Sequence, residues 1–352
     1  MGSISPPSDA SVSRLERIDF LFDRRNPLES ALTVCSRFLP LWSQASVDQV
    51  RLEDISGGIT NKLYKCTLTK GSSAPPVLLR IYGDNTQLLV DRHREQMILT
   101  TLSARNIRPI TFGFFTNGLV QEFLSARPLR SDEIGDPRFV PKIARTVAQL
   151  HKLDVPLPKK PSLWRTIDDW LTLALRNHFD DPQKQLLLER LHLGLIQKEI
   201  DELKEALRHI PSPVVLAHHD LLSGNFLYDD DTGELFLIDY EYGMYGYRGF
   251  DIGNHFQEYA GLGGDYQRYP SREQQYVFFK AYWEEMYGVL PTEEELSSLY
   301  KEVSNYGLVA HIYWGIWAAV QACVSKIDYD YLKYSELRLK EYYRQKHLRL
   351  IP

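Results

Sequence analysis

The stretch that decides the fold reads LAHHDLLSGNFLYDDDTGELFLIDYE and covers residues 216–241. It contains two short apolar runs, 226–228 and 235–238, separated by the polar, glycine-containing segment 229–233. Short β-prone runs on either side of such a segment are typical of an antiparallel hairpin. The sequence therefore predicts two strands joined by a tight turn.

The open end of this hairpin carries two oxygen-bearing side chains. If the turn is centred on Thr232, Asn225 and Asp239 are each seven residues from the centre and lie opposite each other. An amide oxygen beside a carboxylate suits magnesium, which is bound through few protein oxygens and shares substrate phosphates. We therefore predict a magnesium site formed by Asn225 and Asp239.

A third carboxylate, Asp220, precedes Asn225 by five residues and follows the apolar run 214–217. The pattern from His218 to Asn225 is H-x-D-x4-N, which protein-kinase-like phosphotransferases use for a catalytic base and a metal-binding asparagine. Aspartate and asparagine also form ordinary turns, but Asp239 at the expected place favours the catalytic interpretation. We interpret His218 as a hydrogen-bonding brace of the loop and not as the base.

The segment IDYEYGMYGYRGFDIGNHFQEY, residues 238–259, closely resembles the signature of the choline/ethanolamine kinase family, and the similarity extends over 55–346. The resemblance implies a two-lobed, protein-kinase-like α+β fold with an antiparallel amino-terminal sheet and a mostly helical carboxy-terminal lobe. It also implies phosphorylation of an amino alcohol by ATP and magnesium. By this resemblance Asp220 is the catalytic base, and Asn225 and Asp239 are the magnesium ligands.

The distribution of strand and helix patterns agrees with two lobes. We expect residues 1–14 to be disordered, 15–125 to form a nucleotide-binding lobe and 126–352 to form a helical catalytic and amine-binding lobe. The expected amino-terminal strands are 50–56, 62–68, 77–82, 110–115 and 118–124, with helices at 26–48 and 88–104. The expected carboxy-terminal helices are 138–152, 166–178, 182–209, 272–287, 293–324 and 329–346, with one β-rich island at 214–240.

Several amino-terminal residues are candidates for binding the nucleotide. Glycines between strands let backbone N–H groups approach phosphates, although most glycine pairs there are only turns, and the family closes a similar loop over ATP. Arg80 occupies the strand position of the phosphate-holding lysine in protein kinases, and Glu95 on the next helix is its expected ion-pair partner. The alternative is that Arg80 and Glu95 form an ordinary ion pair at the protein surface. The nucleotide candidates are Ser56, Gly57, Gly58, Thr60, Asn61, Arg80, Glu95, Gln121 and Phe123.

The candidates for binding the amine are mostly aromatic. Trp314 and Trp317 are three residues apart and share one helix face, which without the family would indicate ordinary core packing. The resemblance makes them part of an aromatic wall that attracts a cation. The amine candidates by resemblance are Tyr242, Glu258, Trp314, Trp317, Tyr329 and Tyr334, together with Asp220.

The choice between ethanolamine and choline as substrate rests on which members of the family the sequence resembles more. A primary ammonium has three N–H donors that need acceptors, whereas a quaternary head is satisfied by aromatic faces. Glu258 and Asp220 could supply acceptors, but a choline pocket has them too, so their presence alone does not distinguish the two amines. The sequence of residues 258–275, EYAGLGGDYQRYPSREQQ, is more similar to that of the ethanolamine-using members. The sequence at 248–250, RGF, resembles that of the choline-using members. We expect ethanolamine; the alternatives are a choline or dual-specificity kinase, an aminoglycoside-type phosphotransferase, and a catalytically inactive nucleotide-binding scaffold.

Composition limits the partners. The formal charge of the 352 residues is 41 − 46 = −5, and no lysine/arginine block indicates nucleic-acid binding. Three widely spaced cysteines suggest buried thiols rather than disulfides or a zinc site. The apolar run 308–324 contains His311 and Gln321 and is too short for a membrane span, so we expect a buried helix. We expect a cytoplasmic enzyme without stable membrane insertion; a homodimer is plausible for the family.

Overall fold

The computed structural model of the chain describes residues 15–55, 61–69, 74–83 and 89–349. The chain forms two compact units. The first contains Met1–Thr86 and Gln96–Ser125, and the second contains Gln87–Glu95 and Ala126–Pro352. The chain passes from the first unit to the second between Ser125 and Ala126, and Gln87–Glu95 groups with the second unit. The segment 1–14, expected to be disordered, lies outside the described residues.

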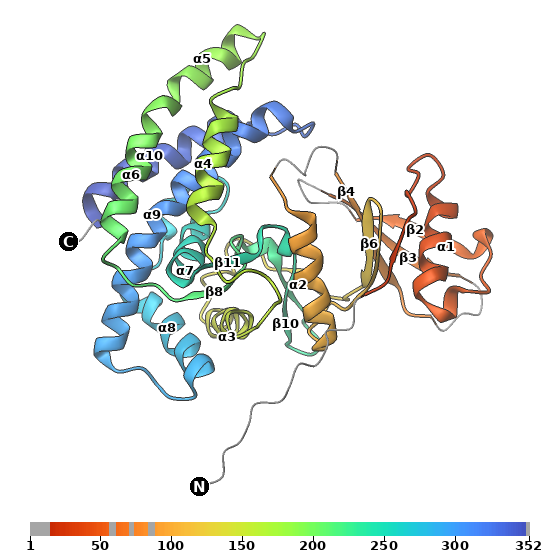
Figure 1. Ribbon diagram of the computed structural model, residues 1–352. Coiled ribbons are helices and arrows are strands. Elements are labelled where there is room, and N and C mark those ends of the chain that lie inside the picture. The colour runs from red at the N-terminus through yellow and green to blue at the C-terminus, as the bar shows by residue number, and fades with distance from the viewer. Residues whose placement is uncertain (1–14, 56–60, 70–73, 84–88, 350–352) are drawn as a thin grey trace. The chain divides into compact units, whose positions relative to one another are not determined.

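The first unit is built on a six-stranded sheet with the order β1-β5-β6-β4-β3-β2 (Figure 1). Its strands are β1 (Arg17–Ile18), β2 (Val50–Asp54), β3 (Asn61–Leu68), β4 (Val77–Tyr82), β5 (Thr111–Phe115) and β6 (Gly118–Glu122). Four pairings are antiparallel, as expected, but β1 pairs with β5 in parallel. The five expected strands therefore pair antiparallel as predicted, and the parallel pairing belongs to β1, which was not predicted. A two-residue strand is too short to show an alternating pattern in the sequence.

Helix α1 (Pro27–Phe38) covers the sheet of the first unit and closes its core. Its buried face carries Val34 and Cys35, which pack in one cluster with Cys66 and Leu79 of the sheet. Pro27 at the first helical position starts the helix without losing a needed N–H donor. The expected helix 26–48 ends early, because two short 3₁₀ turns, Pro40–Trp42 and Val47–Gln49, follow α1.

The second unit is mainly helical. Its helices are α3 (Val140–His151), α4 (Leu163–Ala174), α5 (Pro182–Arg190), α6 (Leu193–Leu207), α7 (Arg248–Gln257), α8 (Arg272–Tyr287), α9 (Glu293–Val324) and α10 (Tyr331–Arg349). Helix α2 (Arg92–Ala104) begins in this unit and continues into the first. The expected helix 182–209 is two helices, because His192 between them adopts a left-handed backbone conformation with φ of 49°.

Helix α9 is the core of the second unit and packs against α7 and α10. It starts at a capping box in which Thr292 accepts from the N–H of Glu295. By length and composition α9 could cross a membrane, but 83% of its apolar window is buried inside the protein. The expectation of a buried helix here is confirmed, because the apolar residues of α9 lie mostly in the protein core.

Helix α7 was not predicted, although it lies inside the family-like signature. Gly249 and Gly253 lower its helix propensity. The structure explains Gly253: a Cβ atom there would come within 2.7 Å of the backbone of Gly307 on α9. The glycine therefore allows α7 and α9 to approach closely, and tertiary packing overrides the local preference.

The predicted hairpin exists as β9 (Phe226–Tyr228) and β10 (Leu235–Leu237), which form a sheet with β7 (Arg127–Pro128). Its register differs by one residue from the prediction. Leu237 pairs with Phe226, so the residue level with Asn225 is Ile238, whose N–H donates to the Asn225 carbonyl at 2.9 Å.

An even-numbered loop causes this shift. The N–H of Asp229 donates to Glu234, leaving four residues between them and placing the centre between Asp231 and Thr232. Gly233, with φ of 73°, supplies the left-handed conformation that closes the loop. Asp239 consequently lies one position beyond Asn225 and is not directly opposite it.

Candidate active site

The loop that carries Asp220 is fixed by a buried carboxylate from another helix. It follows β8 (Val214–Ala217), which pairs with β11 (Met244–Tyr247). The side chain of Asp251 on α7 accepts the backbone N–H groups of His218 at 2.9 Å and His219 at 2.7 Å. Two adjacent backbone donors on one carboxylate leave the loop a single orientation.

Asp251 is itself held by a histidine. His151, at the end of α3, contacts the Asp251 carboxylate through Nε2 at 2.9 Å and the Tyr282 hydroxyl through Nδ1 at 2.8 Å. Burial alone would raise the pKa of Asp251, but the hydrogen bond and charge of His151 outweigh it and lower the pKa to about 2. Asp251 therefore stays charged while fully buried, as its positioning role requires.

Asp220 and Asn225 are in direct contact. The Asn225 amide nitrogen donates to the Asp220 carboxylate at 2.9 Å and to the Asp220 carbonyl at 2.8 Å. Both side chains are buried, at 9% and 8% exposed. The bond fixes the asparagine with its nitrogen toward Asp220, so the amide oxygen is the atom left to bind an ion.

Negative charge gathers around Asp220. Burial raises the pKa of its carboxyl well above the usual range, and the charges of Asp239, Glu258 and Glu241 raise it further, while the bond from Asn225 acts in the opposite direction. Asp239 follows β10 with a left-handed backbone, φ 66° and ψ 66°, which turns the chain at the end of the hairpin. The Asn225 amide oxygen and the Asp239 carboxylate are hard oxygen donors, so the residues present fit a magnesium ion.

A cluster of carboxylates adjoins Asp239. Oxygen atoms of Glu95, Asp239 and Glu241 all lie within 4.8 Å of one another. Arg92 binds two of them, Glu95 at 2.8 Å and Glu241 at 3.2 Å, and thereby offsets part of their mutual repulsion. The sequence analysis missed Arg92 and Glu241, which were not distinguishable from other charged residues without their positions in space.

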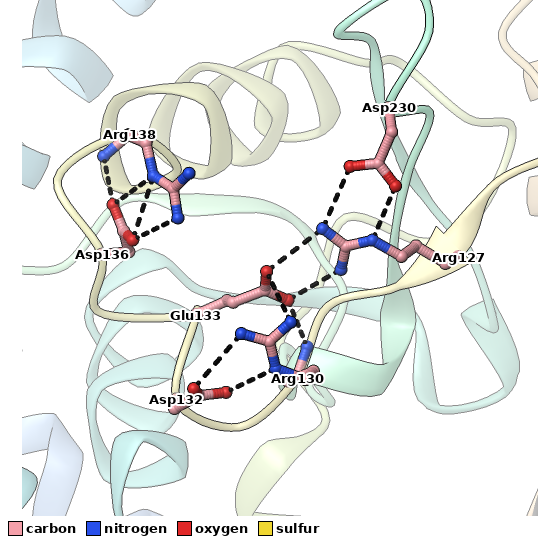
Figure 2. Close-up of polar contacts among 7 residues, drawn as sticks. All are labelled: Arg127, Arg130, Asp132, Glu133, Asp136, Arg138 and Asp230. Atoms are coloured by element: carbon pink, nitrogen blue, oxygen red, sulfur yellow. Dashed lines mark hydrogen bonds and ion pairs between the residues drawn. The ribbon is translucent and has the colours of Figure 1, made fainter.

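An ionic network ties the start of the second unit to the hairpin that carries these ligands (Figure 2). Arg127 on β7 binds Asp230 in the hairpin loop at 2.7 Å and Glu133 at 2.8 Å. Glu133 also accepts the backbone N–H of Arg130 at 2.9 Å. The side chain of Arg127 is 37% exposed, so solvent screens the network and its contribution to stability is modest.

The two histidines of the loop have different surroundings. His218 accepts the N–H of Asp220 at Nδ1, 3.3 Å away, and donates from Nε2 to the Ile238 carbonyl at 2.9 Å. These bonds fit the predicted bracing role, because they connect the loop to the strand before Asp239. His219 packs edge-on against Phe250, and burial lowers its pKa to about 4.

The predicted amine residues on α9 lie in one aromatic cluster with Tyr242. Trp314 packs edge-on against Trp317 with ring centroids 5.3 Å apart and against Tyr242 at 5.5 Å. The Trp317 indole N–H donates to the Tyr242 hydroxyl at 2.8 Å. Tyr242 follows Asp239 by three residues in the sequence, so the cluster adjoins the predicted metal-binding segment.

The remaining amine candidates continue this cluster. Tyr331, which the sequence analysis missed, packs against Trp317 at 5.9 Å and against Tyr329 at 4.9 Å, and Tyr329 packs against Tyr334 at 6.1 Å. Glu258 is 7% exposed. Ring contacts therefore connect the five aromatic amine candidates, and Glu258 reaches Tyr334 through Arg338, which donates to both side chains.

One buried amide links the aromatic cluster to the catalytic loop. The Asn254 nitrogen donates to the His219 carbonyl at 3.1 Å, and its oxygen accepts from the Trp314 indole at 2.8 Å. Sequence reasoning missed Asn254, His151 and Asp251. Asp251 and Asn254 are polar residues on α7, all of whose residues are buried, but this signal was not available from the sequence because α7 was not predicted.

The predicted nucleotide residues of the first unit are partly described. Arg80 lies on β4 and is 5% exposed, and Asn61 begins β3. Gln121 donates from its amide to Thr111 at 2.9 Å, and Phe123 packs beneath Lys65, whose Nζ is 4.6 Å from the ring centroid. Ser56, Gly57, Gly58 and Thr60 lie outside the described residues. The pairing of Arg80 with Glu95 stays a prediction.

Comparisons with known proteins agree on one family. A sequence model described as choline/ethanolamine kinase matches residues 52–343. The chain is 41% identical to a probable ethanolamine kinase of Arabidopsis thaliana over 90% of this chain and 85% of that protein. It is 36% identical to probable ethanolamine kinase A of Dictyostelium discoideum, over 87% and 88% of the two chains.

Solved structures give the same result for the fold. A Plasmodium vivax ethanolamine kinase superposes with a TM-score of 0.78 at 27% identity, covering 92% of this chain and 95% of that one. A choline kinase from Cryptosporidium parvum superposes at 0.75 with 24% identity over 91% and 95%. The expected protein-kinase-like α+β fold is thereby confirmed, and the chain belongs to the choline/ethanolamine kinase family.

Proposed function

We propose that this protein is an ethanolamine kinase, which transfers the γ-phosphate of ATP to the hydroxyl of ethanolamine and gives phosphoethanolamine. The observation that carries the proposal is the contact of Asn225 with Asp220, with the charge of Asp239 acting on the same carboxylate. These are the residue types that phosphotransferases of this fold place around the reacting hydroxyl. Family membership and the similarity to ethanolamine kinases support ethanolamine as the phosphate acceptor.

Asp220 acts as the base in this proposal. Its carboxylate accepts the proton of the attacking hydroxyl and orients the oxygen for in-line attack on the phosphate. The hydrogen bond from Asn225 holds one carboxylate oxygen, and Asp251 holds the backbone of the preceding residues. The base is therefore positioned before the substrate arrives.

Asn225 and Asp239 would hold magnesium through the Asn225 amide oxygen and the Asp239 carboxylate. The ion supplies neutralisation of charge on the phosphates when it is bound. The bond from Asn225 to Asp220 contributes by directing the amide oxygen away from the base. Asn61, Arg80, Glu95, Gln121 and Phe123 remain our proposal for the nucleotide side, together with the glycine loop.

The ammonium group would lie against Trp314 and Trp317, with Tyr242, Tyr329 and Tyr334 completing the aromatic surroundings. A cation over an indole face gains about 0.5–2 kcal/mol, with more when both groups are desolvated. Glu258 would accept an N–H donor, which a primary ammonium has and a quaternary ammonium lacks.

The second candidate is a choline or dual-specificity kinase. The chain is 32% identical to a choline/ethanolamine kinase of Rattus norvegicus over 92% of its length. The tryptophan–tyrosine cluster that we assign to the ammonium suits either head group, since aromatic faces attract both. A cytoplasmic location and a homodimer are further parts of the proposal that need direct measurement.

The test is phosphate transfer from ATP with magnesium, measured in parallel on ethanolamine and choline. We expect a higher kcat/KM for ethanolamine, and we expect Asp220→Asn to lower the rate of transfer to both amines at least about 10²-fold. A higher kcat/KM for choline would change the assigned substrate to choline and leave the proposed phosphate transfer mechanism unchanged. Thermal stabilisation by nucleotide without transfer to any amine would identify an inactive scaffold and contradict the proposal.

A further inference from the structure

Arg338 is a buried cation in contact with two of the residues that we assign to the amine site. It lies on α10, is 2% exposed, and donates from one terminal nitrogen to Glu258 at 2.9 Å and to the Tyr334 hydroxyl at 3.2 Å. Its other terminal nitrogen donates to the Ala310 carbonyl of α9 at 3.1 Å. Neither the sequence reasoning nor the catalytic proposal assigns a role to this side chain.

The contacts of Arg338 connect three elements. Glu258 begins the 3₁₀ turn Glu258–Ala260 after α7, Tyr334 lies one turn before Arg338 on α10, and Ala310 is one turn before Trp314 on α9. A guanidinium presents its donors in a rigid planar fork, so these bonds constrain each other. Fixing Arg338 therefore fixes the Glu258 carboxylate and the Tyr334 ring together.

The ion pair leaves Glu258 able to bind substrate. Arg338 occupies one oxygen, Oε1, whereas an ionised carboxylate offers about four lone-pair sites. A carboxylate held at one oxygen presents its remaining acceptor positions in a fixed direction. The charge of the carboxylate attracts both heads, but only an ammonium with N–H donors also forms hydrogen bonds to its fixed oxygen positions, whereas a quaternary head relies on charge and on aromatic faces.

We propose that Arg338 is a positioning residue of the amine site, which orients Glu258 and Tyr334 and thereby favours a primary over a quaternary ammonium. The inference rests on the proposed ethanolamine kinase function. It concerns the binding of the amine head and leaves the phosphate transfer step to Asp220 and its partners.

The first experiment compares Arg338→Gln with Arg344→Gln. Arg344 is on the same helix and pairs with Glu341, but its side chain is 56% exposed, so it is a matched control. We expect Arg338→Gln to raise KM for ethanolamine about 10-fold or more, as the loss of one charged hydrogen bond would. We expect kcat and KM for ATP to change less than about 3-fold, KM for choline to rise by a smaller factor than KM for ethanolamine, and Arg344→Gln to change none of them.

A double-mutant cycle tests whether Arg338 acts through Glu258. In a Glu258→Gln background, Arg338→Gln should raise KM for ethanolamine by a much smaller factor than it does in the wild type, because the coupled partner is already lost. Arg338→Lys keeps a cation near Glu258 but not the fork, so it should recover part of the ethanolamine preference. If Arg338→Gln does not fold, Arg338→Lys gives the same comparison in a charge-conserving variant.

The outcomes separate the inference from the function on which it rests. An unchanged ratio of ethanolamine to choline kcat/KM in active Arg338 variants overturns the inference alone. A uniform rise of KM for both amines and ATP, with a lower melting temperature, would assign Arg338 a structural role and also overturn it. If the wild-type enzyme phosphorylates no ethanolamine, the proposed function fails and the inference fails with it.

Discussion

Two regions of the second unit contribute to the site in different ways: the catalytic segment, residues 218–239, and the aromatic segment, residues 314–334. The catalytic segment is a loop and hairpin whose polar groups are held by hydrogen bonds, above all those that the loop backbone donates to the Asp251 carboxylate. The aromatic segment is the end of α9 and the start of α10, where rings pack edge to face. Hydrogen bonds position the first region, and helix packing positions the second.

This difference predicts a division of labour. The catalytic segment places charges around a reacting hydroxyl, so changes in it should lower kcat. The aromatic segment surrounds an ammonium group that does not react, so changes in it should raise KM for the amine. Asn254 contacts both regions, so their separation is not complete.

The largest effect is expected for Asp220→Ala. Removing a general base typically lowers kcat 10²–10⁴-fold, and the protein should remain folded, because the substitution relieves a buried and crowded carboxylate. Steady-state kinetics and a melting curve measure the two quantities. Asp231→Ala, an exposed aspartate of the same hairpin, is the control and should leave kcat unchanged; near-native kcat for Asp220→Ala would remove Asp220 from the mechanism.

Asp251→Asn should affect both stability and rate. An amide cannot accept from His151 and both backbone donors as a carboxylate does, so a buried donor loses its partner, which costs about 1–3 kcal/mol of unfolding free energy. A misplaced loop should lower kcat about 10²-fold. Denaturant unfolding and kinetics provide the measurements. Asp168→Asn, which loses a half-exposed pair with Lys204, should change stability by less than about 1 kcal/mol; equal effects would contradict the anchoring role.

Acid should destabilise the second unit through its buried histidines. Burial lowers the pKa of His219 and of His255 to about 4, against 6.5 in the unfolded chain. Between these values the unfolded chain binds the extra protons, so stability falls as the pH is lowered from 6.5 toward 4, by up to about 3 kcal/mol per histidine.

The unfolding free energy measured from pH 7 to pH 4.5 checks this prediction. His255→Gln should flatten the slope by the share of one histidine, whereas the exposed His209→Gln should not. A stability that stays constant from pH 7 to pH 5 would show that these histidines are not buried in the neutral form.

A smaller effect is expected for Trp317→Ala. Loss of a cation–π contact worth about 0.5–2 kcal/mol should raise KM for ethanolamine about 2- to 30-fold and leave KM for ATP nearly unchanged. Trp283→Ala, which removes a helix tryptophan packed against Tyr287, is the control. A similar rise in KM for ATP and ethanolamine would assign Trp317 to general packing and remove the distinction between the two regions.

The sequence was most informative where structure is local. The hairpin around Asn225 and Asp239, the H-x-D-x4-N spacing and helix α9 depend on neighbouring residues, and they were predicted with an error of one residue in register. The amine candidates came from the family resemblance alone, since spacing by itself would have indicated core packing.

What the sequence did not reveal depends on contacts between distant segments. His151 and Asp251 are 100 residues apart, and Arg338 and Glu258 are 80 apart. Nothing in the pattern of either residue identifies its partner. Helix α7 was missed for a related reason. Its glycines lower the local helix propensity, and the close approach of α9 that requires them is visible only in the structure.

The division of labour is tested most directly by calorimetric titration of ethanolamine into Asp220→Asn with a non-hydrolysable ATP analogue and magnesium. We expect ethanolamine to bind within about 5-fold of its wild-type affinity, a change of about 1 kcal/mol, while turnover falls at least about 10²-fold. Loss of ethanolamine binding together with turnover would contradict the division of labour, because binding of the amine would then depend on the catalytic segment as much as on the aromatic segment.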